Sequence, residues 1–461
     1  MTYLPYGHPT FGEGGFGFGQ FGGSTAPTFL QLRQALAIRL DDITNQFWTD
    51  AENGLYIIEA LRMWNVLTGY WKTDFPFQTS NGVVWYSVPK LINSPRVRTV
   101  TDADIYTMME YHLLEPPTGA VWTGTPQFSI AGLSAALLRR RDETLQFGNC
   151  NLSDDTQSAL PNQRRFYLPD NVLEVRRARY VPDPAQDTHP VTLWREDGMS
   201  FQYFESRYLQ TIRKPRSYAI VSAPPLAFDV NDSPSIPGTY DLLTLQTGPV
   251  FSPPAATPLG IPDDFSWIPK WGALGDLLAA ESEANDPLRA AYCQQRYQDG
   301  LKLIAALPWM VLGQINGIAV DTPSVIEMDA FAPEWDSNPS APAAVVTAGM
   351  DFIGISPVPP AGLGVVLTLI ANAPVPSVDT DTVQASPDVL DAILDAAQHL
   401  AALKQGGSEF TDTIPLFKNF VLAAMATNSR LSELGLFLDV LNEQGQRQLE
   451  MQPRFAGTNG G

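Results

Sequence analysis

Residues 262–307 read PDDFSWIPKWGALGDLLAAESEANDPLRAAYCQQRYQDGLKLIAAL, a stretch that predicts two helices separated by a short polar break. Its first part has apolar side chains at steps of three and four residues, which gathers them on one helix face: Trp267, Trp271, Leu274, Leu277 and Leu278. Asp286 and Pro287 then form a typical helix start, since Asp caps the first turn and Pro fits its first position. Such a hairpin cannot bury its apolar faces alone, so it must pack against another copy, another domain or another subunit.

A second stretch has the same order of helix, break and helix. Residues 387–428 read PDVLDAILDAAQHLAALKQGGSEFTDTIPLFKNFVLAAMATN, with the break at residues 406–409. The two stretches begin roughly 125 residues apart and agree in pattern better than in identity. An internal duplication is one interpretation, and a chance similarity between two unrelated helical hairpins is the other.

Composition sets the broad class of the chain. With 461 residues and 44% hydrophobic content, the chain has room for two to four domains with their own cores. No apolar run approaches the roughly 20 residues of a membrane span, so we expect a soluble protein with no membrane partner. The first residues, MTYLPYGHPTFGEGG, lack the features of a signal peptide. Two cysteines are too few for a disulfide framework or a thiolate metal site, so each is expected to be a small buried or half-buried side chain.

The net charge of −20 is unevenly distributed. Residues 217–461 hold 9 Lys and Arg against 27 Asp and Glu, whereas residues 139–216 hold 13 against 11. Broad nucleic-acid binding is disfavoured, because phosphate contacts need clustered cations. An acidic surface favours solubility, or a passage through which DNA slides without sticking.

The first 27 residues are rich in Gly and Phe and predict an extended arm that orders against a neighbour. Gly17, Gly19 and Gly22 formally fit G-x-G-x-x-G, but no strand precedes them, so we prefer the arm to a dinucleotide loop. The arm supplies four candidate interface residues: Phe11, Phe16, Phe18 and Phe21.

Six segments follow from the changes in pattern along the chain. They are an arm (1–27), a helical domain with a β-hairpin (28–150), a β-rich domain with a basic patch (151–255), a helical hairpin (256–310), a β-rich insertion (311–385), and a second helical hairpin with a tail (386–461). The β-hairpin is predicted at residues 75–88, around the turn dipeptide Asn81-Gly82. Thr101 is expected to cap a helix, and the run Arg139-Arg140-Arg141 is expected to face solvent.

The β-rich domain contains the second group of candidate interface residues. Strands are predicted at residues 172–179, 191–194, 217–222, 227–230 and 240–245. The basic patch is formed by Arg213, Lys214 and Arg216, which could contact phosphates or an acidic partner. A solvated turn is the alternative interpretation of this patch.

No catalytic, cofactor-binding or metal-binding residue is predicted, and we expect no cofactor and no enzyme activity. The four histidines, His8, His112, His189 and His399, lack the spacing of a metal site, and no nucleophile elbow or P-loop is present. Adjacent acids such as Asp263-Asp264 are expected to cap helices. An active site assembled from residues distant in the sequence remains open.

Five stretches together resemble virion structural proteins of tailed bacteriophages, particularly head-to-tail adaptor or connector proteins. They are TFLQLRQALAIRLDD (28–42), TDAENGLYIIEALRMWNVLTGYW (49–71), RRFYLPDNVLEVRRARY (164–180), the run from IPDDFSW to YQDGL (261–301), and AAQHLAALKQGGSEFTDTIPLFKNFVLAAMATN (396–428). The resemblance implies an α+β fold of adaptor-like helical hairpins or a bundle, with β-rich inserted regions and an extended terminal arm. The chain departs from small adaptors by its length.

The resemblance also implies a function in the virion neck. It implies a homo-oligomeric ring of twelve copies, made in the host bacterial cytoplasm, that binds the portal protein and tail, collar or fibre proteins while genomic DNA passes through. Exposed apolar helix faces at opposite edges of the fold would favour this ring. A tail-tube, collar or baseplate protein is a second possibility. A virion-associated hydrolase would need two acids facing a groove, and a cell-attachment module would need a β-sandwich with aromatic residues on an open face.

Overall fold

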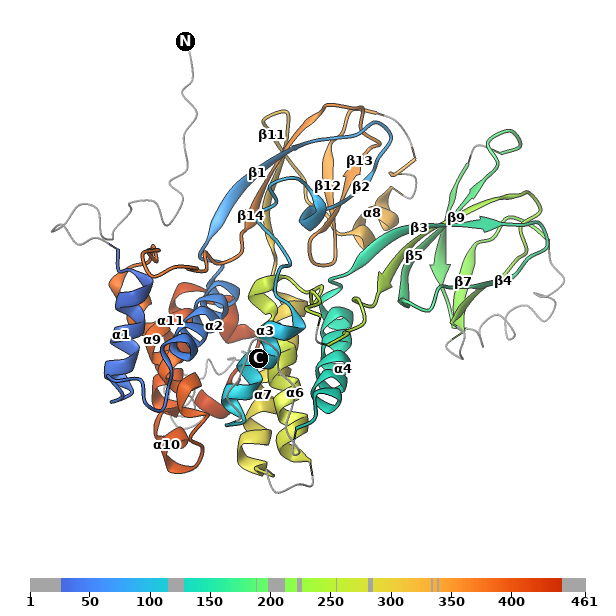
Figure 1. The fold of residues 1–461 in the computed structure, drawn as a ribbon. Coiled ribbons are helices and arrows are strands. Elements are labelled where there is room, and N and C mark those ends of the chain that lie inside the picture. Colours follow the sequence, from blue (N-terminus) through green and yellow to red (C-terminus); the bar gives the residue numbers. More distant parts are fainter. Residues whose placement is uncertain are drawn as a thin grey trace, which may run out of the picture.

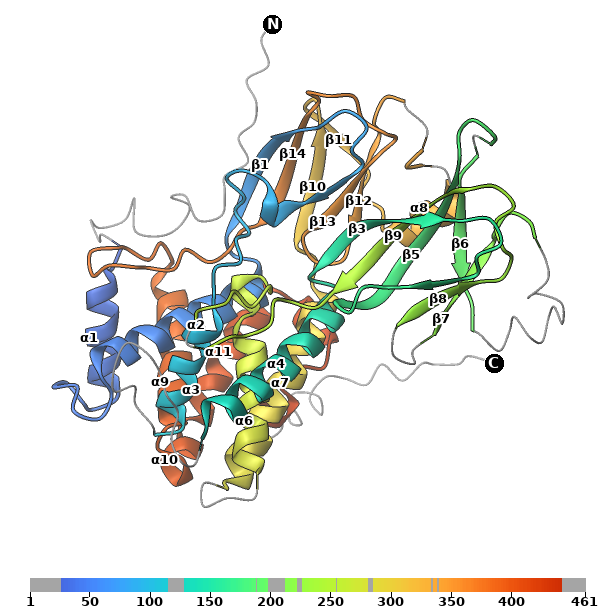
Figure 2. The same cartoon turned by 45° about the vertical axis from the view of Figure 1, so that its right-hand side comes forward.

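The computed structural model of the 461-residue chain describes residues 26–114, 128–187, 189–197, 212–221, 226–253, 255–280, 285–332, 335–337 and 340–441. These residues form a layer of helices on one side and three β-sheets on the other (Figures 1 and 2). One large hydrophobic core joins the helices to the two smaller sheets, and a separate core lies in the largest sheet.

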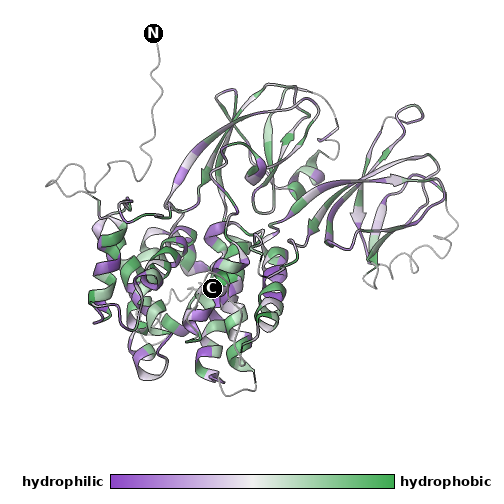
Figure 3. Ribbon diagram, in the orientation of Figure 1, coloured by the Kyte–Doolittle hydropathy of each residue, from purple (hydrophilic) through white to green (hydrophobic). Residues whose placement is uncertain are grey.

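The helical layer is built from helices that are far apart in the sequence. Its members are α1 (Phe29–Arg39), α2 (Asp50–Thr68), α3 (Asp102–His112), α4 (Ile130–Gly148), α6 (Trp267–Ala279), α7 (Pro287–Ala306), α9 (Pro387–Ala402), α10 (Gly407–Asp412), α11 (Ile414–Thr427) and α12 (Arg430–Glu433). The first three begin with capping boxes at Thr28, Thr49 and Thr101. In each box, the side chain of the threonine and that of the third helical residue accept a hydrogen bond from the other's main-chain amide. Hydrophobic and hydrophilic residues occur together on these helices (Figure 3).

The two helices predicted from residues 262–307 are present as α6 and α7, which pack against each other. Asp286 caps α7 through its side chain, as expected, by accepting from the amide of Arg289 at 3.1 Å. Helix α2 packs against α1, α9 and α11, while α4 packs against α6 and α7. The partners that the apolar faces of α6 and α7 require are therefore supplied within this chain.

The largest sheet has seven strands and curls into a half-barrel. Its strands are β3 (Leu152–Ala159), β4 (Arg165–Tyr167), β5 (Val172–Pro182), β6 (Val191–Arg195), β7 (Ser217–Val221), β8 (Ala227–Val230) and β9 (Gly238–Gln246), in the order β3-β9-β5-β6-β7-β8-β4. The β6–β7 pair is parallel and the others are antiparallel. The predicted strands in this region are confirmed, because alternation along each strand is a local signal.

Two smaller sheets combine segments from both ends of the chain. One has the order β1 (Lys72–Gln78), β14 (Gly364–Ile370), β10 (Met310–Ile315), β11 (Ile318–Val320). The other has the order β12 (Ala344–Ala348), β13 (Phe352–Ser356), β2 (Trp85–Ser87), and the short helix α8 (Val325–Phe331) packs on β12. The predicted hairpin at residues 75–88 is wrong, because β1 pairs with β14 and β2 pairs with β13. The Asn81-Gly82 turn redirects the chain from one sheet to the other.

The predicted adaptor-like fold of helical hairpins with β insertions is also wrong. Strands hold 25% of the residues against 40% for helices, and the seven-stranded curled sheet has a core of its own. The sheets are therefore principal parts of the fold. The helical and strand periodicities reveal each element, but they do not reveal which strands pair, and it is the pairing that forms this architecture.

The run of three arginines on α4 does not face solvent as predicted. Only Arg139 is mainly exposed; Arg140 forms an ion pair with Asp276, and Arg141 is buried. The Arg141 guanidinium lies 4.7 Å from the centre of the Phe251 ring and donates to the Pro249 carbonyl at 2.9 Å. The aromatic ring and the carbonyl compensate for the solvation that the guanidinium loses.

Candidate functional site

The structure describes only part of the predicted interface. Phe11, Phe16, Phe18 and Phe21 lie outside the described residues. In the basic patch, Arg213 forms an ion pair with Asp232 at 2.7 Å, Lys214 forms one with Asp187 at 2.8 Å, and Arg216 is exposed. Two of the three cations are thus already paired with carboxylates of this chain, which leaves less free positive charge for a partner than the sequence indicates.

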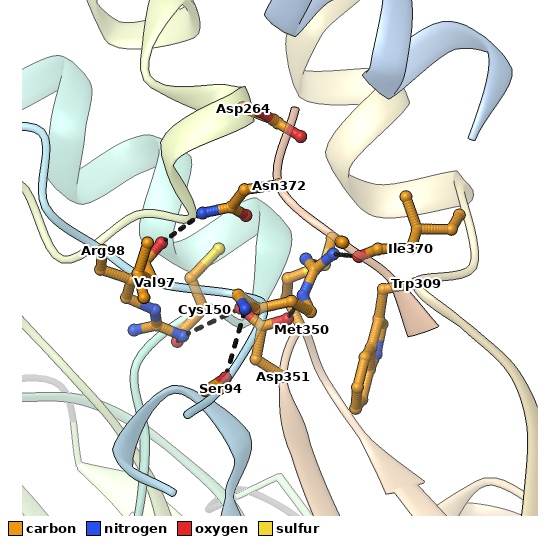
Figure 4. Close-up of polar contacts among 12 residues, drawn as sticks. Ser94, Val97, Arg98, Cys150, Asp264, Trp309, Met350, Asp351, Ile370 and Asn372 are labelled. Atoms are coloured by element: carbon orange, nitrogen blue, oxygen red, sulfur yellow. Dashed lines mark hydrogen bonds and ion pairs between the residues drawn. The ribbon is translucent and has the colours of Figure 1, made fainter. Parts of the chain in front are cut away.

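Buried and half-buried charged residues meet where the helical layer joins the sheets (Figure 4). We call this cluster the polar joint; it consists of Arg96, Arg98, Asp263, Asp264 and Asp351. Arg96 and Asp351 form an ion pair with side chains that are 4% and 0% exposed, and Arg98 lies 3.5 Å from the same carboxylate. Each arginine also donates to a main-chain carbonyl: Arg96 to Ile370 at 2.6 Å and Arg98 to Gly260 at 2.9 Å. The joint therefore ties the segment before α3 to β13, to β14 and to the segment before α6.

The two adjacent acids of the joint do not cap a helix, contrary to the sequence-based prediction. Asp263 accepts hydrogen bonds from the amides of Thr99 at 2.7 Å and Val100 at 3.0 Å. Asp264 accepts from the Asn65 amide group at 2.6 Å and from the amide of Ala373 at 3.1 Å, and burial raises its pKa to about 6. These carboxylates join residues 99–100 and residue 373 to the segment before α6, and Asp264 also joins that segment to the end of α2.

The space beside the joint is too small for a substrate. A cavity of about 20 Å³ is lined by residues that include Asn65, Arg96, Asp264 and Trp309. This volume holds about one water molecule. The charged groups of the joint can therefore fix the positions of the layers, but they have no room to bind and transform a ligand.

A second buried cluster lies inside the helical layer. Lys270 Nζ lies 2.7 Å from Glu59 Oε1 and 3.3 Å from His112 Nε2, and the Trp271 indole donates to Glu59 Oε1 at 3.0 Å. Burial lowers the pKa of Lys270, which Glu59 opposes, and burial together with the Lys270 charge lowers the pKa of His112. Burial therefore favours the neutral form of His112, and the ion pair of this cluster is the one between Lys270 and Glu59.

His399 is a satisfied interior histidine, which the sequence favours over a metal ligand. Its Nε2 lies 2.7 Å from the Tyr292 hydroxyl and its Nδ1 lies 2.8 Å from the Thr413 hydroxyl. Both cysteines are buried, as expected, and burial raises their pKa values to about 12. Within the described ranges, no group of three His, Cys, Asp or Glu side chains is placed to hold a metal ion.

No family model matches the chain, and no curated protein matches its sequence. Within the part of the chain that the structure describes, no helix combines the length and the apolar character that crossing a bilayer requires. The function is therefore inferred from the residues of this chain.

The helical layer has exposed apolar residues at two opposite edges. Helix α1 packs against α2 and α9 at one edge, where Ile38 and Ile43 are 62% and 70% exposed. Helix α4 forms the other edge of the layer (Figure 1). Phe147 is 50% exposed near the end of this helix, and Ala131 and Ala135 are exposed near its start. We call these the α1 edge and the α4 edge. The α1 edge exposes isoleucines, whereas the α4 edge exposes one phenylalanine and small residues, so the two surfaces differ.

Sequence reasoning missed both the polar joint and the two edges. Arg96 and Arg98 are two residues apart, a spacing that points side chains the same way in an extended segment, and this is the signal that could have revealed the joint. The edges depend on which helices lie at the ends of the layer. A single helix sequence contains no information about that position.

Proposed function

We propose that this protein is a structural component of a tailed-phage virion, a ring-forming head-to-tail adaptor that joins the portal to the tail and lets DNA pass. The observation that carries the proposal is the pair of exposed apolar edges at opposite ends of the helical layer. Exposed apolar side chains that gather in one place are typical of protein interfaces. Two such places at opposite ends allow each copy to contact two neighbours.

The difference between the edges favours a head-to-tail contact. We expect the exposed isoleucines of the α1 edge to pack against the small side chains of an α4 edge rather than against another α1 edge. A contact between two different surfaces repeats from copy to copy, and it forms a ring when the rotation closes. The twelve copies implied by the resemblance would be one such closure.

The buried charged clusters support a role as a rigid spacer. The polar joint connects segments separated by up to 274 residues and joins the helical layer to the sheets, while the Lys270–Glu59 pair joins α6 to α2 within the helical layer. The acidic bias of residues 217–461 also suits a wall past which DNA moves, because it repels phosphate. Copies made of rigidly joined layers would keep a central opening at constant width.

Two alternatives lead to different observations. A tail-tube, collar or baseplate protein would also form head-to-tail contacts and would differ in its place on the particle. A virion-associated hydrolase needs acids that face an accessible groove, whereas Asp264 of the polar joint lines a cavity of about 20 Å³ and Asp263 and Asp351 are buried. The geometry of the described residues favours the structural role.

The test is the mass of the purified full-length chain by light scattering, together with cryo-electron microscopy of the virion neck. We expect a closed oligomer in solution and density for the chain beneath the portal. The double substitution Ile38→Asp and Ile43→Asp should lower the mass to that of one chain, because it places charge in the α1 edge. Ile92→Asp is the matched control, since Ile92 is 87% exposed and lies on neither edge. A wild-type monomer that is absent from the particle would overturn the proposal.

A further inference from the structure

The dipeptide Asn-Gly occurs at residues 53–54, 81–82 and 316–317 of the part of the chain that the structure describes, and again at residues 459–460 outside it. In this dipeptide the main-chain nitrogen of the glycine can attack the side-chain carbonyl carbon of the asparagine, because glycine has no Cβ atom to obstruct the approach. The reaction needs a glycine amide that can give up its proton and an asparagine side chain that can turn toward it. Local structure therefore decides which of these dipeptides reacts.

The first dipeptide, Asn53-Gly54, is held inside helix α2. Asn53 is 1% exposed, and its side-chain amide donates to the side-chain oxygen of Asn45 at 3.2 Å. The hydrogen bonds of the helix also fix the main chain on both sides of the dipeptide. The Asn53 side chain would have to break its own contact and distort the helix before it could react.

The second dipeptide, Asn81-Gly82, is exposed, but its glycine amide already has a partner. The Gly82 amide donates to the Pro359 carbonyl at 3.2 Å. The nitrogen that would attack is therefore tied to a neighbouring segment by a hydrogen bond. This bond has to break before the amide can give up its proton.

The third dipeptide, Asn316-Gly317, is exposed and has no such restraint on its glycine. The two residues form the turn between β10 and β11, with φ values of 50° and 77°, which Asn-Gly adopts readily in a two-residue hairpin turn. The turn is held by the pairing of Ile315 with Ile318 and by the Asn316 amide, which donates to the Gly364 carbonyl at 2.9 Å. No hydrogen bond joins the Gly317 amide to another described residue.

We propose that Asn316 is a site of spontaneous deamidation in the folded protein and reacts faster than Asn81 and Asn53. The Gly317 nitrogen loses its proton to hydroxide and forms a bond to Asn316 Cγ, while the Cγ–Nδ2 bond breaks and ammonia leaves. Water then opens the succinimide ring that results. Opening at the main-chain carbonyl gives isoaspartate, and opening at the side-chain carbonyl gives aspartate. The net reaction consumes water and releases ammonia.

The products change the wall of an open groove beside the two smaller sheets. This groove has a volume of about 930 Å³ and is lined mainly by aliphatic side chains and prolines, with Asn316 and Asp321 among its polar residues. Deamidation adds a carboxylate to this lining. Isoaspartate also adds a carbon atom to the main chain of the turn, which disturbs the pairing of Ile315 with Ile318. Strand β11 should therefore loosen from β10 as the protein ages.

The rates at the three sites can be measured together. The full-length folded chain is incubated at mildly alkaline pH, and deamidation at each asparagine is followed by peptide mapping with mass spectrometry. We expect Asn316 to react about fivefold faster than Asn81, because the hydrogen bond of Gly82 has to break first. Asn53 should be the slowest. Reaction at Asn81 as fast as at Asn316 in the folded chain would overturn the proposal.

The same measurement in guanidinium chloride separates structure from sequence. Each asparagine precedes a glycine, and the residue before Asn316 is the bulkier Ile315, whereas Ser80 precedes Asn81. The unfolded sequence therefore gives Asn316 no advantage. We expect similar rates at the three sites in the unfolded chain. A rate ratio of Asn316 to Asn81 that is the same in the folded and the unfolded chain would show that the amide of Gly82 is not protected by its hydrogen bond.

A substitution tests the structural consequence. Asn316→Gln keeps the side-chain amide but would have to form a larger ring, so it should suppress the reaction at this site and leave Asn81 unchanged. Hydrogen exchange in β11 is compared between fresh and aged samples of each protein. We expect an increase on ageing in the wild type and none in Asn316→Gln. An equal increase in both proteins would overturn the assignment of this change to Asn316.

The reaction needs only one folded chain and water, so it does not depend on the proposed ring. A monomer by light scattering that deamidates at Asn316 would sink the ring and leave the modification site standing. A closed ring in which Asn316 reacts no faster than Asn81 would sink the modification site and leave the ring standing.

Discussion

Lys270 Nζ lies 2.7 Å from Glu59 Oε1, and the two side chains are 0% and 1% exposed. The pair joins α6 to α2 across 211 residues of sequence and is enclosed by Trp271, whose ring centre lies 4.2 Å from the ammonium group. A buried ion pair of this kind adds little net stability, but the loss of one partner leaves an uncompensated charge in the interior. It therefore fixes the helical layer in one arrangement.

Lys270→Met should lower the free energy of unfolding by about 3–5 kcal/mol, because it leaves Glu59 buried without its cation. Urea unfolding followed by far-ultraviolet circular dichroism measures this loss. Lys302→Met on the exposed side of α7 is the control, with an expected change within about 0.5 kcal/mol. Adding Glu59→Leu to Lys270→Met should restore part of the stability. Equal losses in the two lysine variants would show that the buried pair has no special effect.

Asp351→Asn should destabilise the polar joint by about 3 kcal/mol or more, since it leaves Arg96 and Arg98 without their shared carboxylate. Asp351 has a positive φ of 72°, which asparagine tolerates well, so the substitution removes charge without straining the main chain. Hydrogen exchange should increase in β13 and in the segment before α3. Asp412→Asn, at an exposed helix end, is the control. Unchanged exchange in Asp351→Asn would contradict the structural role of the joint.

Stability should fall as the pH is lowered below about 6.5, partly because of His399. Burial and the nearby Arg296 charge lower the pKa of His399 to about 3. Between pH 6.5 and pH 3 the unfolded chain binds a proton that the folded chain does not, so this histidine reduces stability by up to about 1.4 kcal/mol per pH unit of acidification. Asp264 acts in the opposite sense between about pH 4 and pH 6, because its raised pKa lets the folded chain bind the extra proton.

Comparison of variants isolates the contribution of His399. His399→Gln keeps polar groups near Tyr292 and Thr413 but does not titrate, so its free energy of unfolding should depend less steeply on pH between 7 and 5. His189→Gln is the control, because the side chain of His189 is 74% exposed. Both variants are measured by urea unfolding at a series of pH values. If His399→Gln keeps the wild-type slope, the buried histidine does not cause the pH dependence.

Sequence signals predicted those parts of the fold that depend on neighbours along the chain. The capping box at Thr101 and the alternation that forms β5 are examples, because each involves residues within a few positions of one another. The pairing of β1 with β14 and of Arg96 with Asp351 joins segments more than 250 residues apart. Such contacts follow from the path of the whole chain, which local periodicity does not specify.

The difference between local contacts and contacts of distant segments also explains which candidate site residues were predicted correctly. The basic patch was recognisable as a run of cations, but its partners Asp187 and Asp232 lie 27 and 19 residues away and were not predicted. The interface role of the arm phenylalanines stays a prediction.

Gly349→Ala should loosen the contact between the end of α4 and the turn that joins β12 to β13. Gly349 has a positive φ of 54°, and a Cβ atom there would lie 2.4 Å from the main-chain oxygen of Asn149, which cannot move aside as a flexible side chain would. The positive φ costs about 1–2 kcal/mol and the overlap adds about 1–3 kcal/mol.

Gly362→Ala is a matched control, because its φ of 75° has the same strain while no atom lies within 4 Å of the new Cβ. Urea unfolding should therefore show Gly349→Ala to be less stable than Gly362→Ala by about 2 kcal/mol. Equal stabilities would mean that the turn and α4 can separate freely, and that this contact does not help to hold the layers together.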